Sequence, residues 1–84
     1  MLSKLIYPQR KKMIVTVVKT NIDMPQEAIK IVNEINKGFI VSKVTIDLED
    51  EDRVLRLEHS DLLDVNKVLR CIRENGFSCQ ELLD

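Results

Sequence analysis

Few side chains in this sequence are of the types that bind soft metals or act as nucleophiles in catalysis. There are two cysteines, Cys71 and Cys79, and one histidine, His59. The spacing of the cysteines is not typical of a metal-ligand pair. His59 has the carboxylates Glu58 and Asp61 near it, but no second ligand at a metal-binding spacing. No nucleophile with a base and an orienting acid can be assembled from these residues, so we expect no enzymatic activity.

Each of these residues has a structural interpretation. Cys71 lies about 100° from the apolar stripe of its predicted helix, at the flank, where it could provide a redox or dimer contact. Cys79 shares a strand face with Phe77 and is expected in the core as a small hydrophobic residue. His59 comes at the end of a predicted strand, and we expect it to be solvated.

Acidic side chains are concentrated in one segment. Residues 47–52 read Asp-Leu-Glu-Asp-Glu-Asp. The segment lacks the glycine and the spaced oxygen ligands of a calcium loop. We expect a solvated hairpin tip that discourages pairing of strand edges, with a docking patch for a basic partner as the alternative.

Charge is distributed unevenly along the 84 residues, although the net charge is only −1. Residues 1–12 carry four basic and no acidic residues. This leaves nine basic and all fourteen acidic residues for residues 13–84, a charge of −5. An acidic body argues against nucleic acid as the main partner. No apolar run approaches the ~20 residues of a membrane span, and we expect a cytoplasmic protein.

The N-terminal segment differs from the rest of the chain. The regular apolar pattern begins at Met13, so residues 1–12 are expected to form a basic tail that is disordered or non-native. Met13 is the alternative candidate for the true start of the protein. Residues 13–84 are expected to form one small domain.

Hydrophobic periodicity predicts the elements that position these residues. Asp23 and Asp64 are expected to cap two helices, and Gly38 and Gly76 to end them. The predicted helices show apolar residues at i, i+3, i+4 and i+7. The predicted order is a strand at 13–20, a helix at 24–37, strands at 39–48 and 53–59, a helix at 65–75 and a strand at 77–83.

This order favours an α+β fold of the ferredoxin-like type, βαββαβ. It would contain a four-stranded antiparallel sheet with two helices on one face. The expected helix stripes are Ala28, Ile31, Val32 and Ile35 in the first helix, and Val65, Val68, Leu69 and Ile72 in the second.

Several segments together resemble a known family. Residues 44–49 read Val-Thr-Ile-Asp-Leu-Glu, and residues 72–77 read Ile-Arg-Glu-Asn-Gly-Phe. With residues 54–57 and the helix around 28–35, their order and spacing over residues 13–83 are similar to the heavy-metal-associated domain family of copper chaperones. The resemblance implies the same fold and a relation to heavy-metal carriers.

The defining motif of that family, Met-x-Cys-x-x-Cys, is missing. Ile22 falls at the Met position, Met24 at the first Cys position and Glu27 at the second. Copper(I) prefers thiolate and thioether ligands, so Met24 with Glu27 is a poor pair and copper transport is doubtful. No cofactor is expected. The alternatives are a protein-interaction or oligomerisation module, with a protein partner or as a homodimer, and a small-ligand-binding regulatory domain.

Overall fold

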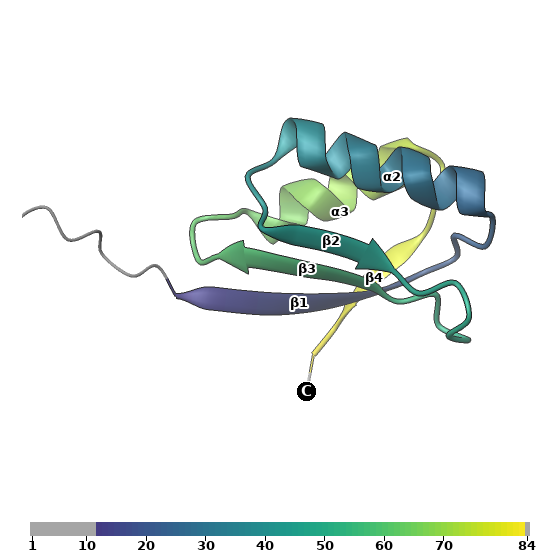
Figure 1. Ribbon diagram of the computed structural model, residues 1–84, viewed down its shortest axis with the longest axis horizontal. Coiled ribbons are helices and arrows are strands. Elements are labelled where there is room, and N and C mark those ends of the chain that lie inside the picture. Colours follow the sequence, from purple (N-terminus) through teal and green to yellow (C-terminus); the bar gives the residue numbers. More distant parts are fainter. Residues whose placement is uncertain (1–11, 84) are drawn as a thin grey trace, which may run out of the picture.

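The structure is a computed structural model that describes residues 12–83 (Figure 1). Residues 1–11, most of the predicted basic tail, lie outside the described residues. The described elements are β1 (Met13–Thr20), α2 (Pro25–Gly38), β2 (Lys43–Ile46), β3 (Leu55–Ser60), α3 (Val65–Glu74) and β4 (Cys79–Leu82).

The four strands form one antiparallel sheet in the order β2-β3-β1-β4. Both helices cover the same face of this sheet (Figure 1). The predicted ferredoxin-like α+β fold is therefore confirmed. Between residues 12 and 83, neither helix is long and apolar enough to cross a membrane.

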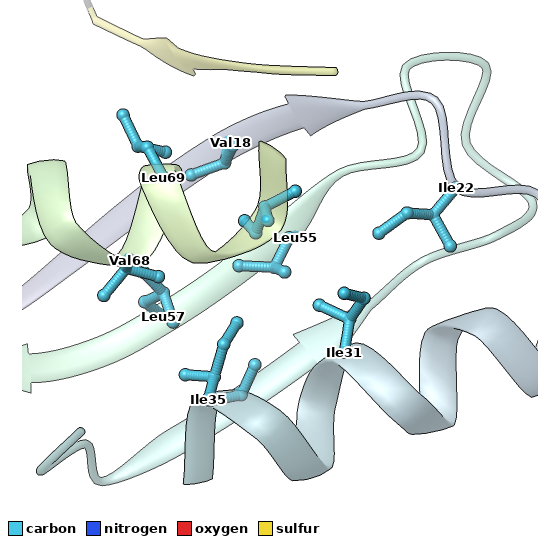
Figure 2. Packing of buried hydrophobic residues seen from close by; sticks show 10 residues of the cluster. Val18, Ile22, Ile31, Ile35, Leu55, Leu57, Val68 and Leu69 are labelled. Atoms are coloured by element: carbon cyan, nitrogen blue, oxygen red, sulfur yellow. The ribbon is translucent and has the colours of Figure 1, made fainter. Parts of the chain in front are cut away.

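The core lies between the sheet and the two helices, as the predicted stripes require (Figure 2). Ile31 and Ile35 of α2 and Val68 and Ile72 of α3 are fully buried. Ala28, Val32 and Val65 pack against them at the edge of the core. Leu69 of α3 is buried as well. The other buried apolar side chains come from the strands and from the loop between β1 and α2: Val18, Ile22, Val44, Leu55 and Leu57.

The ends of α3 follow the sequence prediction. The Asp64 carboxylate accepts a hydrogen bond of 3.1 Å from the backbone N–H of Asn66, which satisfies one of the free donors of the first turn. Gly76 has a φ of +95°, and its N–H donates to the carbonyl of Arg73 at 2.9 Å. A glycine in this left-handed conformation ends the helix without the strain that a Cβ would add.

The ends of α2 differ from the prediction. Met24, not Asp23, is the N-cap residue, and no side chain caps this end. Pro25 is at the first helical position, where the absence of an N–H removes one of the unpaired donors. Gly38 is the last helical residue rather than the residue after the helix, and Phe39 N–H closes the last turn on Ile35 O at 3.0 Å.

The second strand is shorter than predicted, because β2 covers Lys43–Ile46 and not all of 39–48. Phe39 and Val41 precede it and pack against the core from the connecting segment. Apolar residues at these two positions are thus explained by contact with the core and not by membership of a strand. Within β2 the side chains nevertheless alternate as expected for a half-buried strand, since Val44 is buried while Lys43 and Thr45 are exposed.

Candidate functional site

The loop between β1 and α2 is held firmly although it lacks the family's cysteines. Ile22 is fully buried in the core. The Thr20 hydroxyl donates to Arg53 O at 2.7 Å and accepts from Ile22 N–H at 3.2 Å. Asn21 Oδ1 accepts a hydrogen bond of 2.9 Å from the N–H of Ser78. These contacts tie the loop to the β2–β3 connection and to the start of β4.

The two side chains at the ligand positions of the resembled family are a poorly matched donor pair. Met24 is 47% exposed, and Glu27 lies in the first turn of α2 and is partly exposed. Met24 offers a neutral soft sulfur, whereas Glu27 offers a charged hard oxygen, so they favour different metals. Within residues 12–83 there is no group of three or more His, Cys, Asp or Glu side chains arranged to hold a metal ion. This donor set does not fit copper(I).

The two cysteines are free and lie in different environments. Cys71 is partly buried on α3, where Asn75 Nδ2 donates to its backbone carbonyl at 2.8 Å. Cys79 packs against the core, as expected, and its Sγ donates to Leu69 O at 3.4 Å. Desolvation raises the pKa of both thiols. For Cys71 the nearby carboxylates of Glu34 and Glu74 raise the pKa further, whereas Arg73 opposes the shift at Cys79.

A thiol with a raised pKa has little thiolate at neutral pH and is a slow nucleophile. We therefore expect Cys71 to react slowly with iodoacetamide, and the Glu34→Gln variant to react about two- to threefold faster at pH 8, since it removes a negative charge near the sulfur. Peptide mass spectrometry would measure the rate at Cys71. The matched control is Glu51→Gln in the β2–β3 connection, and equal rates in both variants would contradict the expectation.

His59 is not solvated, which corrects the sequence-based prediction. Its side chain is 2% exposed and lies on the helix-covered face of β3. Its Nδ1 lies 2.7 Å from the carbonyl oxygen of Ser60, and its Nε2 lies 2.7 Å from Thr16 Oγ1. Because a carbonyl can only accept, Nδ1 carries the proton in the neutral ring and the Thr16 hydroxyl donates to Nε2. Both ring nitrogens are thus paired within the protein.

The acidic segment 47–52 forms the turn between β2 and β3, as predicted. Asp47 Oδ1 accepts from Glu49 N–H at 3.0 Å, and Asp50 Oδ1 accepts from Asp52 N–H at 2.7 Å. Asp52 also lies 3.6 Å from Lys19 Nζ. Two of the carboxylates therefore shape their own turn by pairing with backbone N–H groups. This arrangement supports the structural interpretation of the segment.

A pocket of about 370 Å³ lies at the opposite end of the molecule, between the end of α2 and the β3–α3 connection. Phe39, Ile40, Leu62 and Leu63 contribute its apolar lining. Its polar side chains include Asp64 and Lys67, which are exposed. This is where a small ligand would bind if the regulatory-domain alternative is correct, and that alternative stays a prediction.

The open face of the sheet carries a different combination of side chains. We define this open face by the outward residues of β1 and their neighbours: Met13, Val15, Val17, Lys19, Lys43, Thr45, Arg56, Glu58, Gln80 and Leu82. Met13 is 58%, Val15 52% and Leu82 38% exposed. Three of the four outward positions of the central strand β1 are thus apolar. The charged residues Glu58 and Arg56 lie beside them on β3, and Leu82 lies beside Val17 on β4.

With this geometry established, the chain was compared with known proteins. No protein-family model, no curated protein and no solved structure matched it. The resemblance to the heavy-metal-associated family stays a prediction.

The structure brings together residues that the sequence patterns did not connect. His59 and Thr16 are 43 positions apart in the chain and meet across β3 and β1. Within residues 12–83, Cys71 and Glu27 belong to no group of three or more His, Cys, Asp or Glu side chains that could hold a metal ion. The open face could have been found from the sequence, because Met13, Val15 and Val17 alternate with residues that face the helices. Its charged neighbours required knowledge of the strand register.

Proposed function

We propose that this protein is a non-enzymatic protein-interaction module and that the open face of its sheet is the binding surface. The observation that carries the proposal is the apolar stripe of Met13, Val15 and Val17 on the central strand. An antiparallel sheet with one face in water normally alternates apolar inward and polar outward residues. On β1 the outward positions are apolar instead, up to Lys19.

The distribution of side chains supports a binding surface. Protein interfaces have an apolar centre and a polar, charged rim. On the open face, Val15 and Val17 occupy the centre. Glu58 and Arg56 lie beside them on β3, and Lys43 of β2 lies beside Glu58. Apolar patches that are bordered by polar residues typically mark sites of protein contact. Burial of this stripe contributes about 25 cal/mol per Å² of apolar surface removed from water.

A metal-carrier function is less well supported. Met24 and Glu27 offer no matched pair of ligands, because one is a neutral thioether and the other a charged carboxylate. Descent from the heavy-metal-associated family is compatible with an interaction module, since one fold carries many functions.

The proposal is tested by co-purification. Two differently tagged copies of the chain are co-expressed, and the proteins retained by one tag are identified by mass spectrometry and bound again in purified form. We expect a retained protein, either the second copy or another protein, whose binding is lost in the Val15→Lys variant. A charged side chain at the centre of an apolar contact is costly to bury.

The matched control is Ile29→Lys, because Ile29 is 62% exposed on α2, on the other side of the molecule. It changes the same kind of residue and adds the same charge away from the open face. If no purified protein binds, or if Ile29→Lys weakens binding as much as Val15→Lys, the open face is not the binding surface.

A further inference from the structure

Resting on the proposed function, we propose that the partner is a second copy of this chain. The two sheets pack face to face about a two-fold axis. The axis lies between the two sheets and is perpendicular to the strands. It passes over the paired residues Thr16, Leu57 and Val44 of β1, β3 and β2. Symmetric dimers of this kind are the commonest assemblies of identical chains.

The strand register defines two rows of outward side chains. In one row, Lys43 of β2 lies beside Glu58 of β3, which lies beside Val15 of β1. In the other row, Thr45 lies beside Arg56, which lies beside Val17. The row between them, at Leu57, faces the helices, so the two outward rows are neighbours on the open face. One row has an acidic residue on β3 and the other has a basic one.

A two-fold axis across the strands places each row over the other row of the second copy. Arg56 then faces Glu58 of the second copy, and Glu58 faces its Arg56. Val15 faces Val17 in the same way, which joins the two apolar stripes. Face-to-face sheets keep their strands within about 30° of each other, so neighbouring rows stay approximately aligned. At positions 15, 17, 56 and 58 the open face is therefore self-complementary in both charge and apolarity.

The alternative two-fold axis, parallel to the strands, gives a poorer match. When this axis passes over β1, it places β3 over β4 of the second copy, because these strands lie on opposite sides of β1. Arg56 would then lie over Leu82 of the second copy, because both residues pair with Val17, one on each side of β1. A charge covered by an apolar side chain is left without a partner, and this is strongly unfavourable. The charges thus select the axis across the strands.

The outward residues at the two ends of β1, Met13 and Lys19, are also compatible with this arrangement. With the axis at the level of Thr16, Lys19 lies over Met13 of the second copy. The aliphatic part of a lysine can cover an apolar side chain while its ammonium group stays in water. Lys19 already has its ammonium group 3.6 Å from Asp52 of its own chain. The ends of the apolar stripe are therefore covered without burial of an unpaired charge.

Charge exchange tests the proposal, with sedimentation velocity from micromolar to millimolar protein as the measurement. Wild type is expected to show a concentration-dependent dimer. Arg56→Glu makes positions 56 and 58 both acidic, and Glu58→Arg makes them both basic. Each variant alone is expected to weaken dimerisation at least about tenfold, because like charges then face each other.

Two combinations are expected to restore the dimer. An equimolar mixture of the Arg56→Glu and Glu58→Arg proteins places opposite charges over each other at every contact, so it should form a mixed dimer. The double variant with both changes should dimerise within about threefold of wild type, since it exchanges the two charges without changing their sum. Circular dichroism of each variant shows whether the monomer is folded.

The outcomes separate this inference from the proposed function. A wild type that stays monomeric over the whole concentration range, or a mixture that associates no better than the single variants, overturns the second-copy inference. If such a monomer still binds another purified protein and Val15→Lys removes that binding, the proposed function stands while the inference fails. If neither is observed, both fail.

Discussion

Replacement of Leu57 by alanine is expected to lower the free energy of unfolding by about 2–5 kcal/mol. Leu57 has no exposed surface and lies on β3, between Thr16 of β1 and Val44 of β2. Its side chain points toward the two helices, where Ile35 and Val68 also contribute to the core (Figure 2). Truncation at this position removes buried apolar surface and leaves a cavity that the rigid sheet cannot close.

The effect should be large relative to the whole stability of the domain. A domain of this size buries only about 60% of the surface of its unfolded chain, and total stabilities are about 5–15 kcal/mol. Urea titration, followed by circular dichroism at one protein concentration, measures the change. Fixed concentration matters because any dimer stabilises the folded state by mass action.

The control is Ile29→Ala, which truncates a large apolar side chain that is 62% exposed on α2. It is expected to change the free energy of unfolding by no more than about 0.5 kcal/mol. Similar losses in the two variants would show that Leu57 is not in a tightly packed environment. The comparison therefore tests the assignment of the helix-covered face of β3.

The elements with a clear period could be predicted from the sequence. Val68, Leu69 and Ile72 are spaced for one helix face, and the structure buries all three. Leu55 and Leu57 alternate with Arg56, and this alternation indicates which face of the strand is inward. Element order then restricted the topology, because two amphipathic helices and four half-apolar strands must share one core. The fold followed from these local patterns acting together.

Helix ends were harder to predict because several residues can cap a helix. Asp23 and Asp64 are the same residue type before a helical pattern, yet only Asp64 accepts a backbone hydrogen bond as a cap. At the start of α2, Ile22 is buried and Pro25 takes the first helical position, so the helix begins one residue later than an Asp23 cap requires. Tertiary packing of Ile22 thus determined the local geometry.

The candidate site was predicted only in part. The resemblance aligned Met24 and Glu27 with the thiolate positions of the resembled family, and the structure places both at the start of α2, where Met24 is exposed and Glu27 partly exposed. His59 was assigned wrongly because its position at a strand end suggested solvent. Its position in the strand alternation was the better indication. His59 follows Leu57 by two residues and therefore lies on the same, buried face. The polar partner that makes this burial possible, Thr16, comes from a distant part of the sequence.

Thr16→Val is the second substitution with a large expected effect. Valine has nearly the shape of threonine, so packing is retained while the hydroxyl that donates to His59 Nε2 is lost. The buried nitrogen is then left without a partner, which costs about 1–3 kcal/mol. Thr16 is 5% and His59 2% exposed, so water cannot easily replace the hydroxyl. Urea unfolding at one concentration should show this loss of stability.

A double-mutant cycle separates the hydrogen bond from other effects of the substitution. His59→Leu alone leaves the Thr16 hydroxyl unpaired, whereas Thr16→Val together with His59→Leu removes both polar groups, and such paired removal is often nearly neutral. The double variant should therefore lose less stability than the sum of the two single variants. Gln26→Met in the first turn of α2 provides the control for a polar-to-apolar exchange, since Gln26 is exposed away from the open face and a change of at most about 0.5 kcal/mol is expected. Additive losses in the cycle would mean that the 2.7 Å contact between Thr16 and His59 contributes no net stability, and the burial of His59 would then depend on its bond to Ser60.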